Sequence, residues 1–234
     1  MSEILRVEGV GLAFGGLRAL HDVSITVNRG EAVALVGPNG SGKSTLLNVI
    51  SGFYTPKMGK IWFEGEDVAP LARFERARRG IARTFQNARV FPRLTAREHL
   101  IVPGVRSMPR IQPDELLDVV GYVGPRGTPA GSLAYGHRRL VEVARALALE
   151  PRLLLLDEPT AGLNGSEVEA FQESLEGVRA RFGLTLIVVE HKMDFLEVVC
   201  GRMVVLREGE VLCDLPPADA LRDPRVRDAY LGAQ

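Results

Sequence analysis

Residues 37–45, with the sequence GPNGSGKST, most constrain what this 234-residue chain can fold into. They fit the phosphate-binding loop pattern G-x-x-x-x-G-K-[ST], in which a buried strand leads into the loop and a helix follows it. The apolar run Ala32–Val36 predicts that strand, residues 45–51 predict the helix, and Gly52 is placed to end it. We therefore expect a strand–loop–helix unit near the start of an α/β domain.

Each residue type in this loop has a chemical reason. Glycines let backbone N–H groups converge on phosphate oxygens, and the N-terminus of the following helix adds partial positive charge. Lys43 can reach the β- and γ-phosphates of a nucleotide, and the Ser44 hydroxyl can ligate magnesium. A glycine-rich turn before an ordinary helix is the alternative interpretation, but such a turn needs neither the lysine nor the hydroxyl. The residues expected to bind a nucleoside triphosphate are Gly37, Pro38, Asn39, Gly40, Ser41, Gly42, Lys43, Ser44 and Thr45.

Composition limits what surrounds the loop. With 234 residues, 46% of them apolar, the chain can form one large α/β domain, or a core domain that carries a smaller subdomain. The formal net charge is zero, so we expect no nucleic-acid partner. Cys200 and Cys213 are too few and too far apart to suggest a disulfide framework. We expect no secretory signal after Met1 and no membrane span, since no window approaches ~18 apolar residues.

Hydrophobic patterns in the first part of the chain predict an antiparallel sheet. Residues 4–8 and 23–27 alternate apolar and polar side chains, as half-buried antiparallel strands do, and residues 60–64 can extend the same sheet. Prolines and glycines break the pattern from 91 to 131. Apolar residues with helical spacing then cover 138–149.

The last part of the chain predicts helices that alternate with buried strands. Residues 153–156 form an apolar run typical of a central parallel strand. Ser166 and Glu169 are spaced as a capping box that opens a helix, which Gly183 ends before a further strand at 184–189. The expected buried stripe of that helix comprises Val168, Phe171, Leu175, Val178 and Phe182. No internal repeat or low-complexity linker is visible, so we expect one compact unit.

Two carboxylates, Asp157 and Glu158, come directly after the strand expected at 153–156. Open α/β sheets bind ligands at the carboxyl ends of their strands. Asp157 is placed there to hold magnesium, directly or through water, and Glu158 to orient or deprotonate the attacking water. Alone, such residues would be interpreted as solvated turn carboxylates, but the upstream loop favours the catalytic interpretation. His191 follows the next strand and is placed to contact the γ-phosphate.

With these residues, the chain resembles the ATP-binding subunits of ABC transporters over essentially its full length. The loop corresponds to the Walker A motif and residues 153–158 to Walker B. Gln86 matches the Q-loop glutamine, which in that family contacts magnesium and water, and His191 matches the switch histidine. Phe14 matches the aromatic residue that stacks on adenine. The resemblance implies ATP and Mg²⁺ as cofactors, with Glu158, His191, Gln86 and Lys43 as catalytic residues and Ser44, Gln86 and Asp157 as metal ligands.

Residues 133–140, with the sequence LAYGHRRL, resemble the ABC signature that opens a helix. In the family this segment acts in trans, because it caps the γ-phosphate bound to the Walker A loop of a second subunit. The resemblance therefore implies that nucleotide held by a second subunit contacts Ala134, Tyr135, Gly136 and His137. Gly136 and the helix N-terminus behind it provide the chemistry of a second anion-binding site.

The signature departs from the family pattern at two positions. Ala134 replaces the usual serine, whose hydroxyl would bond the phosphate across the interface and contribute ~1.5–3 kcal/mol. His137 replaces the usual glutamine and adds a pH-sensitive charge. The segment 94–131 is also shorter than in the amino-acid importer group. These departures leave open a slow or partner-dependent ATPase.

The resemblance implies an α/β fold, with a P-loop NTPase (RecA-like) core, an antiparallel β subdomain and a small helical subdomain. It implies a single ATP-binding domain over 1–234. The core and the antiparallel subdomain would occupy about 1–91 and 150–234, and the helical signature subdomain about 92–149.

Several short sequence segments are most similar to those of the subunits that energise branched-chain amino acid importers. They are FGGL at 14–17, GIARTFQN at 80–87, AGLN at 161–164, which matches the D-loop, and the tail at 223–232. The implied function is ATP hydrolysis that drives import of branched-chain amino acids, or a similar small polar solute, through a separate permease. Urea or amide import and lipopolysaccharide export are alternatives. A soluble non-transport ABC ATPase is another, although the chain lacks the long coiled-coil insert, duplicated cassette or basic surface expected of one.

The resemblance also implies partners and a location. The partners are transmembrane permease subunits, a second copy or a homologous ATPase subunit, and indirectly a solute-binding protein. The chain would lie on the cytoplasmic side of the inner membrane, held there through the permease. Residues expected to line the groove for the permease are Asn87, Phe91, Leu94 and Glu98, although ordinary subdomain packing explains them equally well.

Overall fold

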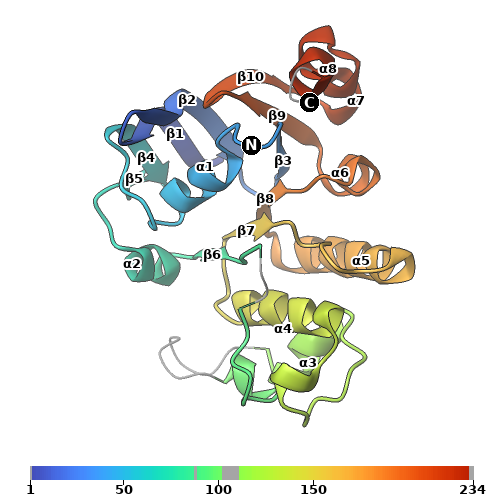
Figure 1. The fold of residues 1–234 in the computed structure, drawn as a ribbon. Coiled ribbons are helices and arrows are strands. Elements are labelled where there is room, and N and C mark those ends of the chain that lie inside the picture. The colour runs from blue at the N-terminus through green and yellow to red at the C-terminus, as the bar shows by residue number, and fades with distance from the viewer. Residues whose placement is uncertain (1, 87–88, 102–110, 232–234) are drawn as a thin grey trace.

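The computed structural model describes residues 2–86, 89–101 and 111–231, with a six-stranded sheet at its centre (Figure 1). The strands of this sheet are β3 (Ala32–Val36), β6 (Ile81–Arg83), β7 (Leu153–Asp157), β8 (Thr185–Val189), β9 (Arg202–Arg207) and β10 (Glu210–Leu215). Their order is β10–β9–β3–β8–β7–β6, and all neighbours are parallel except β9 and β10. The buried strands expected at 32–36, 153–156 and 184–189 are confirmed.

The three central strands β3, β7 and β8 are buried along their whole length because both faces of the sheet are covered. Alternate side chains enter two separate cores, as the two-residue period of a strand requires. Leu153 and Leu155 pack with the antiparallel sheet and the helix that follows the loop. Leu154 and Leu156 pack instead with Phe171 and other residues of the helices on the opposite face. The near-continuous apolar sequence of these strands therefore has a structural cause.

A four-stranded antiparallel sheet covers one face of the core sheet, in the order β2–β1–β4–β5. Its strands are β1 (Glu3–Phe14), β2 (Leu17–Asn28), β4 (Met58–Phe63) and β5 (Glu66–Asp67). β1 pairs antiparallel with both β2 and β4, so the expected three-strand arrangement is confirmed. The first two strands are longer than the alternating pattern indicated, and β1 ends at Phe14.

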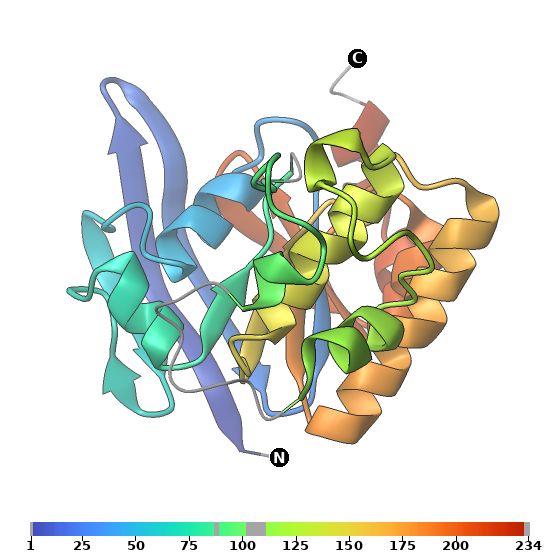
Figure 2. The same ribbon diagram turned by 90° about the horizontal axis from the view of Figure 1, so that it is seen from below.

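Helices complete the remaining layers (Figures 1 and 2). They are α1 (Lys43–Ile50), α2 (Arg73–Arg78), α3 (Pro113–Val119), α4 (Tyr135–Leu147), α5 (Gly165–Phe182), α6 (Met193–Val199), α7 (Pro217–Arg222) and α8 (Pro224–Leu231), with 3₁₀ turns at Glu98–Leu100 and Ala130–Ser132. α3 and α4 form the helical lobe beside the core sheet, and α5 lies on the opposite side of that sheet from the antiparallel strands. The expected fold class is thus confirmed. None of the described helices is long and apolar enough to cross a bilayer.

The start of α5 corrects the expected capping box. The N-cap is Asn164 rather than Ser166: its side chain accepts the Glu167 N–H at 3.0 Å, and the Glu167 carboxylate accepts the Asn164 N–H at 2.9 Å. The capping box therefore has the expected three-residue spacing, but it begins at Asn164, two residues before the expected Ser166. Gly183 ends α5 in the left-handed region at φ +61°, as expected. Phe182 is not on the buried stripe, because the last turn of α5 leaves its side chain 43% exposed.

Candidate nucleotide-binding and catalytic site

The loop between β3 and α1 needs glycine at two of its positions for steric reasons. Gly37 has a φ of +145°, and a Cβ there would lie 2.1 Å from the Leu206 carbonyl oxygen. Gly42 has a φ of +104°, and a Cβ there would lie 2.7 Å from the Ala19 carbonyl oxygen. The loop therefore lies directly against neighbouring backbone, a close approach that only glycine permits.

Lys43, the first residue of α1, folds back under the loop. Its Nζ donates to the carbonyl oxygens of Gly37 at 2.7 Å and Pro38 at 2.9 Å. Burial lowers the pKa of Lys43, and the carboxylates of Glu158 and Asp157 oppose that shift. An ammonium group has three donor hydrogens, so one is still available for a phosphate oxygen. The buried Ser41 hydroxyl has no partner among the described residues, which also fits a loop built to hold an anion.

A cavity of about 350 Å³ opens beside the loop and gathers most of the expected site residues. Its lining comprises Phe14, Leu17, Arg18, Ala19, Asn39, Gly40, Gly42, Lys43, Ser44, Thr45, Gln86, Glu158, Val189 and His191. Gly37, Pro38, Asn39 and His191 line a neighbouring cavity with Tyr230, whose hydroxyl accepts the Gly37 N–H at 2.9 Å. Phe14 is 45% exposed, lines the cavity of about 350 Å³ and lies edge-on to Tyr54. An aromatic face at one end and a phosphate loop at the other suit a nucleotide.

Glu158 stands at the end of β7 between two of the expected catalytic residues. The Gln86 Nε2 donates to both Glu158 carboxylate oxygens at 3.2 Å. The His191 Nε2 lies 3.3 Å from Oε1 of the same carboxylate. Glu158 has a φ of +50°, a conformation uncommon for a residue with a side chain and one that often occurs at functional sites. The structure therefore brings together three residues that lie far apart in the sequence.

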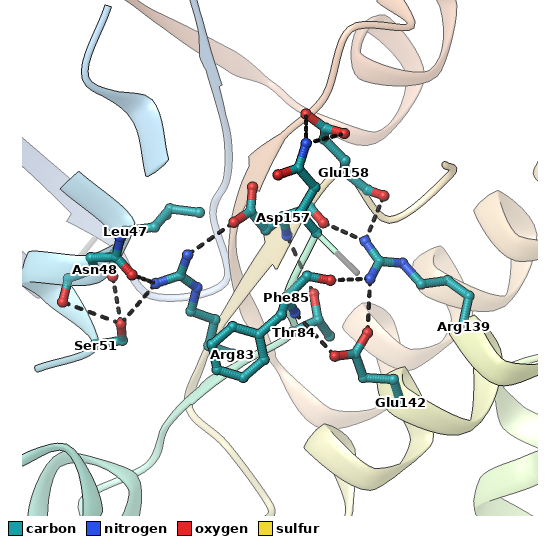
Figure 3. Close-up of polar contacts among 11 residues, drawn as sticks. Leu47, Asn48, Ser51, Arg83, Thr84, Phe85, Arg139, Glu142, Asp157 and Glu158 are labelled. Atoms are coloured by element: carbon teal, nitrogen blue, oxygen red, sulfur yellow. Dashed lines mark hydrogen bonds and ion pairs between the residues drawn. The ribbon is translucent and has the colours of Figure 1, made fainter. Parts of the chain in front are cut away.

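Asp157, the last residue of β7, is buried and forms an ion pair that the sequence did not indicate. The Arg83 Nη2 donates to Asp157 Oδ2 at 2.9 Å (Figure 3). Arg83 is the last residue of β6, next to β7 in the sheet, so the pairing follows from strand order. Burial lowers the pKa of Arg83, and its hydrogen bond with Asp157 opposes the shift.

A second buried arginine, Arg139 on α4, binds the other side of the same strand end (Figure 3). Its guanidinium donates to the carbonyl oxygens of Phe85, Asp157, Glu158 and Pro159. It also donates to the Glu142 carboxylate at 2.7 Å, and both side chains are almost completely buried. The other Glu142 oxygen accepts the N–H groups of Phe85 and Arg89, at 3.1 and 3.4 Å.

Sequence reasoning missed Arg139 and Glu142, although one signal was present. They are opposite charges three residues apart within an amphipathic helix that also carries Leu140 and Val143. Such a pair is usually interpreted as a solvated helix surface. Here burial raises the pKa of Glu142, and the Arg139 charge opposes that shift.

The signature residues lie apart from the cavity that contains Lys43. Ala134 is the N-cap of α4, and Tyr135 is its first residue, with its hydroxyl donating to the Gln86 carbonyl oxygen at 3.4 Å. A Cβ on Gly136 would lie 2.9 Å from Leu163, and the His137 ring lies edge-on to Tyr122. None of these four residues lines the nucleotide cavity of the same chain.

The expected metal ligands fit magnesium by position and by chemistry. Ser44, Gln86 and Asp157 line one cavity of about 380 Å³, together with Asn48 and Arg83. Their hydroxyl, amide and carboxylate oxygens are hard donors, which suit Mg²⁺ when phosphates and water supply the remaining ligands. Across the described part of the chain, no group of three His, Cys, Asp or Glu side chains forms an alternative metal site.

Two of the residues expected to contact a permease, Phe91 and Glu98, lie next to His99, a buried histidine in the helical lobe. The exposed Phe91 ring stacks on the His99 ring. The His99 Nε2 accepts the Phe91 N–H at 2.8 Å, so Nδ1 carries the hydrogen that is donated to the Thr95 carbonyl oxygen. The Glu98 carboxylate accepts the Thr95 N–H, Leu94 is half-buried, and Asn87 lies outside the described residues.

The phosphate loop follows the parallel strand β3, and the Asp157 and Glu158 carboxylates lie at the end of β7, two strands away in the same sheet. This arrangement defines a P-loop nucleotide-binding domain. Residues 20–161 match the family described as ABC transporter, and the chain belongs to that family. It is accordingly an ATP-binding and ATP-hydrolysing subunit of the ABC transporter class.

Full-length relatives have two different transport roles. The high-affinity branched-chain amino acid transport ATP-binding protein BraF of Pseudomonas aeruginosa is 35% identical over 249 residues, covering 98% of both chains. The lipopolysaccharide export system ATP-binding protein LptB of Haemophilus influenzae is 35% identical over 237 residues, covering 99% of this chain and 98% of the relative. Among solved structures, the ADP conformation of the ATP-binding cassette MJ1267 has a TM-score of 0.87 and 31% identity, covering 99% of this chain and 100% of that one.

Replacing Arg139 with methionine is expected to destabilise the protein strongly. The change leaves the Glu142 carboxylate buried without its counter-charge, which typically costs about 3–5 kcal/mol. Chemical denaturation measures the loss. Arg181→Met is the matched control, since the exposed Arg181–Glu115 pair contributes roughly 0–1 kcal/mol. Equal effects of the two substitutions would contradict the role given to Arg139.

His99 is expected to make stability depend on pH. Burial lowers its pKa, so below about pH 6.5 the unfolded chain binds more protons than the folded one. The contribution of neutral His99 is therefore present above that pH and is lost as the pH falls. Urea denaturation across this range should show a steeper loss for the wild type than for His99→Asn. Identical pH slopes for the two proteins would rule out this role of His99.

Proposed function

We propose that this chain binds ATP in the cavity beside the 37–45 loop and hydrolyses it with Glu158 to drive import of branched-chain amino acids, or a similar small polar solute. The observation that carries the proposal is the placement of the Glu158 carboxylate between Gln86 and His191 in the cavity that also contains Lys43. A carboxylate held there can orient water and accept its proton.

Each part of the site has a separate task. Lys43 and the backbone amides of the loop bind the phosphates, and Phe14 provides a face for the base. Glu158 accepts the proton of the attacking water, and His191 orients the γ-phosphate and that water. When bound, magnesium would be held by Ser44, Gln86 and Asp157 and would neutralise charge that develops on the phosphates.

The proposed site is completed by a second copy of the chain or a homologous subunit. Ala134, Tyr135, Gly136 and His137 do not line the nucleotide cavity of their own chain. Ala134 and Tyr135 nevertheless begin a thirteen-residue helix, α4, whose N-terminus carries partial positive charge suited to a phosphate. In trans, this segment would cap the γ-phosphate held by the partner's loop.

The proposed cargo rests on similarity, because the described site contains nothing that contacts a transported solute. The BraF relative, named for branched-chain amino acid transport, favours an amino-acid cargo. The partners we propose are transmembrane permease subunits and, indirectly, a solute-binding protein. The LptB relative supports lipopolysaccharide export as a second candidate. In either case the chain would lie on the cytoplasmic side of the membrane, with Phe91, Leu94 and Glu98 near the permease.

Replacing Glu158 with glutamine is expected to lower ATP turnover by about 10²- to 10⁴-fold, because the amide cannot accept the proton. Phosphate release measures turnover, and equilibrium binding of a fluorescent ATP analogue should change little. Glu169→Gln, on the exposed side of α5, is the matched control and should retain full activity. Turnover of Glu158→Gln at the wild-type rate would overturn the role of Glu158.

The same variant tests the second copy. With ATP bound and hydrolysis slowed, Glu158→Gln should elute as a dimer in size-exclusion chromatography, and it should elute as a monomer without ATP. An ATP-bound monomer would show that the in-trans arrangement is wrong.

The cargo is tested with the permease reconstituted in liposomes. Leucine supplied with the solute-binding protein is expected to stimulate ATP turnover by the wild-type complex. Stimulation by lipopolysaccharide instead would replace the importer with an exporter, while leaving the ATPase assignment intact.

A further inference from the structure

Arg83 joins two elements that flank the expected magnesium position (Figure 3). Its Nη1 donates to Asn48 Oδ1 at 2.7 Å and to Ser51 Oγ at 3.1 Å, both on or next to α1. Its Nη2 donates to Asp157 Oδ2 at 2.9 Å, at the end of β7. The side chain is only 6% exposed, so these contacts are not those of a surface arginine.

The residues that Arg83 contacts on α1 share a face with an expected metal ligand. Ser44, Asn48 and Ser51 are spaced at i, i+4 and i+7, which places them on one side of a helix. Ser44 and Asn48 line the same cavity as Asp157 and Arg83. A connection from Asn48 to Asp157 therefore fixes how far the Ser44 hydroxyl lies from the Asp157 carboxylate.

The environment of Arg83 leaves it little freedom to move. Its guanidinium lies over the rings of Phe85 and Phe53, with 5.3 and 5.9 Å from Cζ to the ring centroids. Its Nε is buried without a hydrogen-bond partner among the described residues. Burying a cation in this way is unfavourable unless it is paired with an opposite charge, which here is Asp157.

Asp157 depends on Arg83 in the same way. The carboxylate is buried, and the nearby Lys43 ammonium donates to the carbonyl oxygens of Gly37 and Pro38 instead of to Asp157. Within the described ranges, Oδ1 of Asp157 has no hydrogen-bond partner, whereas Oδ2 bonds Arg83. One oxygen is therefore held and the other is available to a ligand.

We propose that Arg83 is a positioning residue for magnesium: it holds Oδ2 of Asp157 and the Ser44 face of α1 in one arrangement, so that Oδ1 and the Ser44 hydroxyl serve the same ion. The inference rests on the magnesium site proposed above. It requires the fork of an arginine, because Nη1 and Nη2 bond opposite sides of the cavity at once. A lysine carries the charge but has a single nitrogen with which to bond both sides.

The test is the magnesium-dependent part of nucleotide binding. The dissociation constant of a fluorescent ATP analogue is measured in excess EDTA and in excess MgCl₂, and the ratio of the two values is the magnesium effect. For Arg83→Met, this ratio is expected to fall by about 10- to 100-fold, as for the loss of residues that orient metal ligands, while the constant in EDTA stays within about twofold. Phosphate release at varied MgCl₂ should show a matching rise in the magnesium concentration needed for half-maximal rate.

Three further variants separate positioning from charge and from folding. Arg73→Met removes a guanidinium that lies over the same Phe53 ring at 5.1 Å but does not contact Asp157, so its magnesium effect should equal that of the wild type. Arg83→Lys should stay folded yet recover only a small part of the effect. Asn48→Ala keeps the Arg83–Asp157 pair and the longer contact with Ser51 but loses the 2.7 Å contact with Asn48. It should show an intermediate loss even if Arg83→Met fails to fold.

The outcomes are distinguishable. A wild-type protein without any magnesium effect would overturn the proposed magnesium site itself. A normal wild-type effect that persists in Arg83→Met, or is fully restored in Arg83→Lys, would overturn only the role of Arg83. An undiminished effect in Asn48→Ala would show that the connection to α1 is not used.

Discussion

The rest of the site depends on how the buried Arg139 guanidinium binds the end of strand β7. Strands of a parallel sheet end in carbonyl groups that need partners once helices exclude water. Arg139 supplies donors to the carbonyl oxygens of Asp157, Glu158 and Pro159, and to that of Phe85 from the neighbouring segment. Because Glu142 balances the charge, the pair can remain buried. This one side chain therefore binds the backbone that carries both the Asp157 and the Glu158 carboxylates.

Two arginines from different parts of the chain therefore bind different groups at the end of β7 (Figure 3). Arg139 binds backbone oxygens from the helical lobe, whereas Arg83 binds the Asp157 side chain from the adjacent strand β6. The segment from Arg83 to Gln86 is held at both ends, since Arg83 bonds Asp157 and Gln86 bonds Glu158. Between them, Glu142 accepts the Phe85 N–H. These contacts connect α4 to Glu158 and to the segment that carries Gln86. The helical lobe is therefore bonded directly to the residues that line the cavity beside the loop.

Sequence patterns predicted the structure correctly where neighbouring residues favour a single local conformation. The loop, the buried strands and the glycine at the end of α5 follow from spacing and from residue type alone. The prediction failed where two similar local choices compete, as Asn164 with Glu167 and Ser166 with Glu169 do for the start of α5. It also missed the short strand β6, the mostly buried strand β9 and the edge strand β10. The few residues of β6 and the half-buried side chains of β10 give weak periodicity. Phe182 was misplaced because it is the last residue of α5, and helical spacing alone does not show that this position is 43% exposed.

Sequence patterns alone establish that a phosphate loop precedes a helix, that Asp157 and Glu158 follow a buried strand, and that the chain resembles ABC transporter ATPases. These are short-range patterns, in which chemistry and spacing lie within a few residues of each other. Only the tertiary structure decided which side chains pair across the sheet: Arg83 with Asp157, Arg139 with the end of β7, and Gln86 and His191 with Glu158. Those pairings join residues that are 18 to 74 positions apart in the chain. Strand order and helix packing bring them together, and no local sequence pattern contains that information.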